Sequence, residues 1–290
     1  MRKNGGSIVE YAVLNTDTKM PLEGIGTFMM SPAEAQNAVT NALKSGYELV
    51  DTANAYMNEK AVGRGIKASP KTRADIFLVS KLWPSVYPDE TAIDQTLARL
   101  GTDYLDLLFL HQPVGDYLAG YRQLEKAYKE GKVKALGLSN FSKEQIQEIL
   151  DNCEITPAVL QVEAHPYYPQ TELREFLRPL GIKIMAWYPL GHGDKQLINE
   201  EIFAKLAQKY GKSNAQIILR WHIQLGNIVI PGSTDPEHIR ENADIYDFEL
   251  TDAEMAEIAK VDKNKRYYDL SQAEAEKRYT AIRPDFNEQN

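Results

Sequence analysis

Three strand-like runs in the first half of the chain each end in an ionisable residue. Asp51 follows YELV, Lys81 follows DIFLVS and His111 follows YLDLLFL, while Tyr56 stands five residues after Asp51. A short, nearly continuous apolar run is typical of a parallel strand that is buried on both faces. The carboxyl ends of such strands carry the chemistry of open α/β sheets and α/β barrels. We therefore expect the four side chains to meet at one rim and to form a site for proton transfer.

Each of these residue types has a specific use in such a site. A lysine buried near a barrel mouth is costly without a counter-ion, and Asp51 would supply one. A lysine beside a tyrosine stabilises the phenolate, so Lys81 is expected to lower the pKa of Tyr56 and to let it donate a proton near neutral pH. His111 would hydrogen-bond the same reacting oxygen. Taken singly, each residue is also compatible with a helix cap or an exposed position.

Composition narrows the class of protein. The 290 residues carry a formal net charge of −8 and no basic tract, which argues against nucleic-acid and anionic-membrane partners. The single cysteine, Cys153, excludes an intrachain disulfide and fits a reducing compartment. Residues 1–15 contain no long apolar stretch, so neither a signal peptide nor a membrane span is expected. These features favour a cytoplasmic enzyme, which we expect to be a monomer that acts on a small molecule.

Strand-like and helix-like segments alternate along the chain. Strands are expected at residues 24–28, 47–51, 75–81, 103–111, 133–139, 158–164, 182–188 and 227–233, each followed by a helix. Eight such units predict a closed (β/α)8 TIM barrel, and the lack of a linker predicts one domain over residues 1–290. Residues 7–24 are expected to form a β-hairpin that caps the barrel. The polar and aromatic tail from about Lys263 is expected to lie across the barrel.

Two other site types find little support in the sequence. Tyr56 and Lys60 have the Tyr-x-x-x-Lys spacing of short-chain dehydrogenases, but Gly24-Ile-Gly26 lacks the third glycine of their dinucleotide-binding turn. Lys60 is therefore expected to be an exposed helical lysine. The chain also has no Cys/His cluster that would indicate a metal site.

The segments around the rim residues resemble the signatures of the aldo-keto reductases. Residues 46–53 (GYELVDTA) with Tyr56 are similar to the first signature, although Gly-Tyr/Phe-Arg is more usual there than Gly-Tyr-Glu. Residues 137–141 (GLSNF) and 161–166 (QVEAHP) resemble two further signatures, and the resemblance runs from Met20 to about Leu250. It is closest to the bacterial branch of 2,5-diketo-D-gluconate reductase-like enzymes and aldehyde reductases. It implies a catalytic tetrad of Asp51, Tyr56, Lys81 and His111.

The resemblance also implies a nicotinamide dinucleotide that is held without a Rossmann turn. Ser139, Asn140 and Gln161 would hydrogen-bond the carboxamide, and Trp187 would stack on the nicotinamide ring. The segment from Tyr188 to Gly191 would follow the pyrophosphate. The cofactor-binding residues implied in this way are Ser139, Asn140, Gln161, Trp187, Tyr188, Pro189, Leu190, Gly191, Ile230, Pro231, Gly232, Ser233, Thr234, His238, Glu241 and Asn242.

One departure from the family pattern concerns the choice of cofactor. Most relatives that use NADPH read Ile-Pro-Lys-Ser where this chain has Ile-Pro-Gly232-Ser, and they carry arginine where His238 stands. That lysine and arginine hold the 2′-phosphate of NADPH. The phosphate clamp is thus weakened at Gly232 and His238, and we expect NADH to be used as well as NADPH. The alternative is that Ser233, Thr234 and Arg240 are enough to keep a preference for NADPH.

The expected function is reduction of aldehydes or ketones to alcohols with NADH or NADPH, in the carbonyl reductase or alcohol dehydrogenase class. Tyr56 would be the general acid. The substrate-binding residues would be Phe28, Tyr56, Trp83, His111 and Gln112, the last standing where many relatives carry tryptophan. Two rival functions are a Schiff-base aldolase with Lys81 as nucleophile and a non-catalytic family member that only binds the cofactor.

Overall fold

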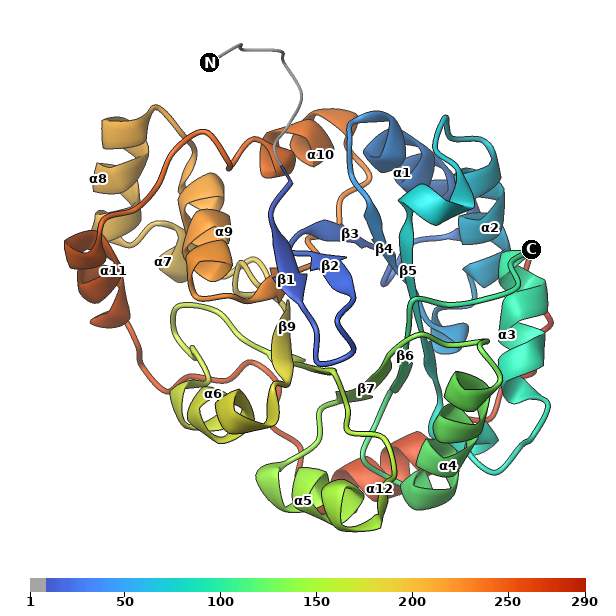
Figure 1. The fold of residues 1–290 in the computed structure, drawn as a ribbon. Coiled ribbons are helices and arrows are strands. Elements are labelled where there is room, and N and C mark those ends of the chain that lie inside the picture. The colour runs from blue at the N-terminus through green and yellow to red at the C-terminus, as the bar shows by residue number, and fades with distance from the viewer. Residues whose placement is uncertain (1–8) are drawn as a thin grey trace.

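Parallel strands form a barrel at the centre of the molecule in the computed structural model, which describes residues 9–290 (Figure 1). Within these residues the sheet has eight strands, in chain order β3 (Gly24–Gly26), β4 (Leu49–Asp51), β5 (Phe77–Leu82), β6 (Leu107–Leu110), β7 (Leu136–Ser139), β8 (Val159–Glu163), β9 (Lys183–Trp187) and β10 (Ile228–Val229). A parallel bridge between Glu23 and Val229 brings the first and last strands together. The prediction of a (β/α)8 barrel is confirmed.

The strands are buried on both faces, as their apolar sequences indicate. In β5, Val79 packs with Leu49 and Leu107 in the barrel interior, while Leu78 packs with the surrounding helices. Side chains fill the barrel interior so closely that one position accepts no side chain at all. A Cβ at Gly137 would lie 2.4 Å from the ring of Phe109 on the neighbouring strand, so only glycine fits there.

Helices surround the barrel (Figure 1). In the described part of the chain they are α1 (Pro32–Lys44), α2 (Glu59–Lys67), α3 (Ala92–Leu100), α4 (Tyr117–Lys129), α5 (Lys143–Asn152), α6 (Thr171–Leu177), α7 (Lys195–Ile198), α8 (Glu201–Tyr210), α9 (Asn214–Gln224), α10 (Pro236–Ala243), α11 (Asp252–Ala259) and α12 (Gln272–Thr280). α1 begins with a capping box, in which Ser31 and Glu34 each accept the other's backbone N–H. α11 and α12 are not predicted from the sequence, because each buries only one or two side chains and lacks a clear helical periodicity of apolar residues.

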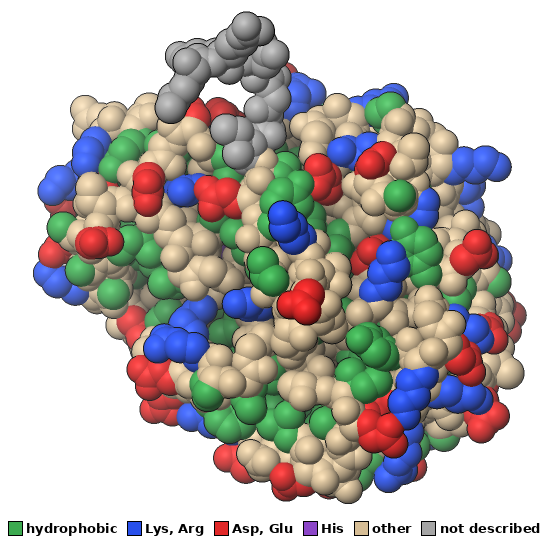
Figure 2. Space-filling model, viewed as in Figure 1, with side chains coloured by type: hydrophobic (Ala, Val, Ile, Leu, Met, Phe, Trp, Pro, Cys, Tyr) green, Lys and Arg blue, Asp and Glu red, His purple; other side chains and the backbone are tan. Residues whose placement is uncertain are grey.

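An antiparallel hairpin covers the amino-terminal end of the barrel. Its strands are β1 (Tyr11–Val13) and β2 (Lys19–Pro21), and Leu14 and Met20 pack into the barrel interior. The hairpin prediction is confirmed for residues 9–24, whereas Ser7 and Ile8 lie outside the described residues. On this face, acidic and basic side chains are interspersed (Figure 2).

The C-terminal tail crosses the opposite end of the barrel, as predicted, and hydrogen bonds hold it there, among them those to Glu163, Trp83 and Lys60. The Glu163 carboxylate accepts the N–H groups of residues 267 and 268 at 2.8 and 3.0 Å. The indole N–H of Trp83 donates to the carbonyl oxygens of residues 279 and 282. Lys60 Nζ donates to the carbonyl oxygens of residues 287 and 289 at 2.9 and 3.1 Å. Lys60 is therefore half-buried under the tail, and its prediction as an exposed helical lysine is wrong.

In residues 9–290 no helix combines the length and the apolar character needed to cross a membrane. All eight barrel strands belong to one sheet. The prediction of one domain over residues 1–290 stays a prediction, since it includes residues outside the described range.

A buried carboxyl group lies at the closing seam of the barrel. Glu23 is 4% exposed, and its carboxylate accepts a hydrogen bond from the hydroxyl of Tyr47 at 3.4 Å. No basic side chain of residues 9–290 forms an ion pair with it. Burial raises the pKa of Glu23 to about 8 from the ordinary value of 4.5. The native protein therefore holds a proton here that the unfolded chain releases.

We expect this proton to make stability depend on pH. Between about pH 4.5 and about pH 8 the native state binds the extra proton, so the free energy of unfolding should fall as pH rises, by up to about 1.4 kcal/mol per pH unit. Glu23→Gln should remove this part of the slope and be more stable than wild type at pH 8. Urea unfolding at pH 5, 6.5 and 8 measures the effect, and parallel curves for the two proteins would contradict it.

Candidate active site

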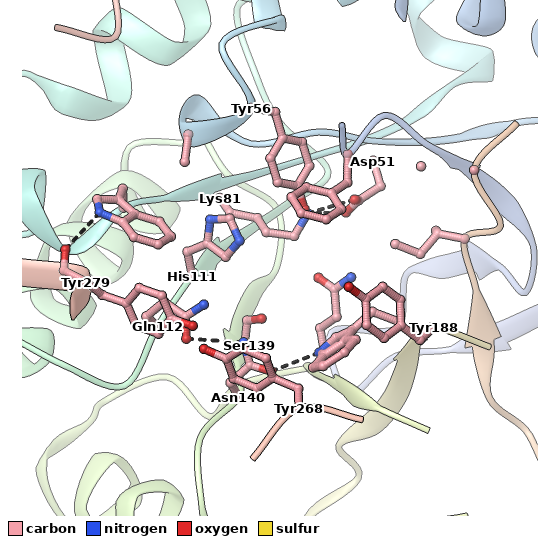
Figure 3. Close-up of a pocket in the computed structure, with 18 of the residues that line it drawn as sticks. Asp51, Tyr56, Lys81, His111, Gln112, Ser139, Asn140, Tyr188, Tyr268 and Tyr279 are labelled. Carbon is pink, nitrogen blue, oxygen red and sulfur yellow. Dashed lines mark hydrogen bonds and ion pairs between the residues drawn. The ribbon is translucent and has the colours of Figure 1, made fainter. Parts of the chain in front are cut away.

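A cavity of about 580 Å³ opens at the carboxyl ends of the strands (Figure 3). Its wall includes all four rim residues, namely Asp51, Tyr56, Lys81 and His111. Asp51 is the last residue of β4, Lys81 is the fifth residue of β5, and His111 directly follows β6. Because these strands are neighbours in one parallel sheet, their carboxyl ends bring the side chains together.

Asp51 and Lys81 form a buried ion pair. Lys81 Nζ lies 2.8 and 2.7 Å from the two carboxylate oxygens of Asp51, and each residue is 1% exposed. The same ammonium donates to the carbonyl oxygen of Thr52 at 3.0 Å and to the phenolic oxygen of Tyr56 at 3.2 Å. Burial raises the pKa of Asp51 and lowers the pKa of Lys81, and each charge opposes the shift of the other. The pair thus compensates two charges that would each be costly alone.

Tyr56 ends a short 3₁₀ turn, Asn54–Tyr56, which follows β4 almost at once. Its ring packs against Phe28 and edge-on against His111, with centroid distances of 5.2 and 5.6 Å. Burial raises the pKa of Tyr56 well above its usual value, and the charge of Asp51 adds to the rise. The expectation of a lowered pKa is therefore wrong, because Asp51 compensates the charge of Lys81 and burial dominates. As a result Tyr56 keeps its proton at neutral pH.

His111 lies beside Tyr56 as a neutral imidazole. Burial lowers its pKa well below the usual value, and the charge of Lys81 lowers it further. The ring packs edge-on against Trp83 at a centroid distance of 5.1 Å. Its Nδ1 is buried and has no hydrogen-bond partner among residues 9–290. A neutral histidine can still donate one hydrogen bond, from whichever ring nitrogen carries the proton.

A group of amides lies across the cavity from the ion pair. Ser139 of β7 pairs in register with Gln161 of β8, and Asn140 follows Ser139 in the left-handed region at φ +66°. Asn140 Oδ1 accepts from the indole N–H of Trp187 at 2.8 Å, and its Nδ2 donates to Gln112 Oε1 at 3.3 Å. Gln161 Oε1 is buried and has no partner among the described residues. A bound carboxamide would satisfy this oxygen, so the residues present fit a nicotinamide.

The remaining cofactor-binding candidates fall into two groups. Four of them also line the cavity: Tyr188, Pro189, Ile230 and Gly232. Eight do not line it: Leu190, Gly191, Pro231, Ser233, Thr234, His238, Glu241 and Asn242. Two of the eight follow β9, and the other six lie between β10 and α10 or on α10 itself. They can therefore contact only a ligand that extends out of the cavity. Their roles stay predictions.

The expected position of the phosphate clamp carries an acidic side chain. Asp235 caps α10 by accepting the N–H of Glu237 at 2.8 Å, and its own N–H donates to Ser233 Oγ at 3.1 Å. Asp235 Oδ2 also lies 4.0 Å from Nδ1 of His238, and the two side chains are 49% and 66% exposed. The local charge is therefore less favourable to a phosphate than the lysine and arginine of the usual pattern.

The substrate-binding candidates Phe28, Trp83 and Gln112 line the cavity together with Tyr56 and His111. Six further lining residues were not predicted from the sequence: Gly26, Ala55, Tyr268, Arg278, Tyr279 and Ile282. Four of these belong to the C-terminal tail. Their only sequence signal is the aromatic and basic content of that segment, which does not show which side chains face the barrel.

Comparison with known proteins places the chain among enzymes. A family model described as "Aldo/keto reductase family" matches residues 24–263. Glyoxal reductase of Bacillus subtilis is 43% identical over 265 residues, which cover 90% of this chain and 95% of the relative. An aldo/keto reductase structure from Brucella melitensis is 42% identical and has a TM-score of 0.84, covering 88% of this chain and 100% of that one. A Bombyx mori aldo-keto reductase, solved in complex with NADP, is 32% identical with a TM-score of 0.85, covering 90% and 95%.

A double-mutant cycle tests whether Asp51 and Lys81 depend on each other. Asp51→Asn or Lys81→Met alone leaves one buried charge without its partner, so each should lower the free energy of unfolding by about 3–5 kcal/mol. The double variant should lose clearly less than the sum of the two losses. Urea unfolding measures all four proteins, and the exposed pair Glu257 and Lys260 serves as a control that should show little coupling. Additive losses at Asp51 and Lys81 would contradict the inference.

Proposed function

The chain belongs to the aldo/keto reductase family, and we propose that Tyr56 is the general acid of its reaction. The enzyme is an NAD(P)H-dependent oxidoreductase that reduces aldehydes or ketones to alcohols. The observation that carries the proposal is the contact between the phenolic oxygen of Tyr56 and Lys81 Nζ at 3.2 Å, inside the cavity. Because Lys81 donates in this contact, the proton of Tyr56 remains available to a substrate oxygen.

The proposed mechanism assigns one task to each residue. Ser139, Asn140 and Gln161 would hold a nicotinamide, which would supply the hydride for the carbonyl carbon when bound in its reduced form. Tyr56 donates its proton to the carbonyl oxygen, and Lys81 stabilises the phenolate that remains until solvent returns a proton. Asp51 keeps Lys81 in place, and neutral His111 donates a hydrogen bond to the same oxygen. Positioned acid catalysis contributes about 10²–10⁴-fold, and one donor at the developing oxyanion contributes roughly 3–4 kcal/mol.

The two rival functions have weaker support. A Schiff-base nucleophile needs an unprotonated amine with a free approach to its substrate. Lys81 Nζ instead contacts Asp51, Thr52 and Tyr56, so its donors are already engaged. Borohydride trapping of a carbonyl substrate would reveal an aldolase, and turnover of a simple aldehyde would exclude a non-catalytic protein.

The cellular setting is part of the proposal. A cytoplasmic monomer fits a chain with one cysteine and a net charge of −8. The relative named glyoxal reductase and the relative solved with NADP make small carbonyl compounds and nicotinamide cofactors the first ligands to test.

Tyr56→Phe should separate chemistry from binding. The variant loses only the proton donor, so kcat should fall by at least about 10²-fold. The dissociation constants of NADH and NADPH should change little, because the amide group across the cavity is intact. Steady-state kinetics and cofactor fluorescence measure the two properties, with Tyr210→Phe on α8 as the control. Turnover above about a tenth of the wild-type rate would overturn the assignment.

We also propose that NADH is used at least comparably to NADPH. The usual lysine and arginine are replaced by Gly232 and His238, and Asp235 stands beside the histidine. Each lost charged hydrogen bond is worth roughly 1.5–3 kcal/mol, and exposure of the region favours the lower end or less.

Restoring the clamp tests this proposal. Gly232→Lys with His238→Arg should raise NADPH affinity and affect NADH little. A Cβ at Gly232 would lie 3.3 Å from the carbonyl oxygen of Gly26, so the substitution needs only a small local shift. Gly232→Met with His238→Gln controls for bulk without charge. Dissociation constants of both cofactors decide the matter, and a wild-type preference for NADPH of about a hundredfold would refute the proposal.

A further inference from the structure

A fully buried histidine behind the cavity has both of its ring nitrogens bonded. His222 lies on α9 and is 0% exposed. Its Nε2 is 2.9 Å from the carbonyl oxygen of Pro189, and its Nδ1 is 2.9 Å from Nδ2 of Asn227. Burial lowers the pKa of His222 to about 3, so the ring is neutral at physiological pH. The mechanism proposed above gives this side chain no task.

The neighbours of His222 determine which of its nitrogens carries the proton. An arginine only donates hydrogen bonds, so Arg174, whose Nη1 lies 2.7 Å from Asn227 Oδ1, orients the Asn227 amide. The amide nitrogen of Asn227 must then donate to Nδ1 of His222. The proton of the neutral ring is therefore on Nε2, from which it is donated to Pro189. The three side chains form one series of donors and acceptors that ends at the carbonyl oxygen of Pro189.

The residue that accepts this hydrogen bond belongs to a turn in the cavity wall. Trp187, Tyr188 and Pro189 all line the cavity, and Tyr188 has a φ of +51°. A residue other than glycine rarely adopts this left-handed conformation, and a following proline restricts its backbone further. Figure 3 shows Tyr188 on the side of the pocket opposite His111. An uncommon backbone conformation persists only where the surrounding contacts hold it, and His222 supplies such a contact.

We propose that His222 is a positioning residue, which holds the turn at residues 187–191 in the shape that binds the nicotinamide half of the cofactor. The inference rests on the proposed function, and His222 itself would touch neither substrate nor cofactor. The Trp187 indole, which would stack on the nicotinamide, is held at one end by its hydrogen bond to Asn140 at 2.8 Å. The donor from His222 holds the backbone that follows. Without this donor the carbonyl oxygen of Pro189 would lose its buried partner, and the turn would relax.

His222 also has a simple structural explanation. It ties α9 to the segment after β9, and both of its hydrogen bonds would contribute to stability. Gln224 on the same helix makes a comparable pair of contacts, since its amide donates to and accepts from the backbone of Leu250 at 2.8 Å in each case. Leu250 does not line the cavity. A purely structural role would lower stability in variants of either residue and would leave cofactor binding unchanged.

Three substitutions of His222 separate positioning from stability. His222→Phe keeps a ring and removes both hydrogen bonds. The short amide of His222→Asn can meet Asn227 but does not reach Pro189, whereas the longer amide of His222→Gln places a donor near the position of Nε2. Gln224→Met is the control on the same helix. The measurements are the free energy of unfolding in urea, hydrogen exchange of residues 188–193 without cofactor, and the dissociation constants of NADH and NADPH.

His222→Asn and His222→Phe should raise both dissociation constants about tenfold and by similar factors, because NADH and NADPH share the nicotinamide half. Exchange at residues 188–193 should be faster in the cofactor-free variants. With saturating cofactor, kcat should fall about tenfold while KM for a simple aldehyde changes little, since a misplaced nicotinamide weakens the chemical step. His222→Gln should restore cofactor affinity and kcat towards wild type. Gln224→Met should lower stability alone.

The matched amides decide the inference even if His222→Phe does not fold. Wild-type dissociation constants in His222→Asn overturn it, and so do equal rises in His222→Asn and His222→Gln. A rise in Gln224→Met as large as that in His222→Asn also overturns it, because the effect would then follow stability. Failure of the proposed function has a different result, since wild type would then bind neither NADH nor NADPH and would reduce no simple aldehyde.

Discussion

The buried pair of Asp51 and Lys81 is the interaction on which the rest of the site depends. Either charge alone would be costly inside the barrel, so β4 and β5 must stay in the register that joins them. Burial has the largest effect on the protonation of the two neighbouring groups, and the charge of Asp51 adds to it at Tyr56 and that of Lys81 at His111. Tyr56 keeps its proton although an ammonium group lies 3.2 Å away, and His111 stays uncharged in a polar site.

A second buried ion pair lies behind the first. Successive residues of a strand point to opposite faces, so Ser80 of β5 points away from Lys81 and donates to Glu59 at 2.7 Å. Glu59 in turn pairs with Arg99 at 2.7 Å, and Arg99 reaches the side chain of Asn287 near the end of the tail. One strand thus links the catalytic cavity to the segment that covers it. The ion pair of Glu59 and Arg99 therefore contributes both to the packing of β5 against its helices and to the position of the tail.

The sequence predicts the barrel and the rim residues because both depend on local patterns. Buried parallel strands have recognisable apolar runs, and the residues that end them must share one edge. Local patterns could not predict which tail residues line the cavity, because Tyr268 is positioned by Glu163, more than a hundred residues earlier. The pKa of Tyr56 was predicted in the wrong direction, because the direction depends on the balance between burial and the charges of Asp51 and Lys81. That balance depends on distances in the folded protein, and the spacing of residues along the sequence does not give them.

The small buried area of the tail has a consequence for how the protein responds to heat. α12 buries only Ala275 and Tyr279, whereas all six residues of β5 are buried. Segments with little buried apolar surface open locally at a lower free-energy cost than the core. On warming, the tail should therefore detach while the barrel and its ion pair remain folded. The enzyme would then lose its ability to distinguish substrates before it loses its ability to reduce them, so selectivity and turnover would have different thermal limits.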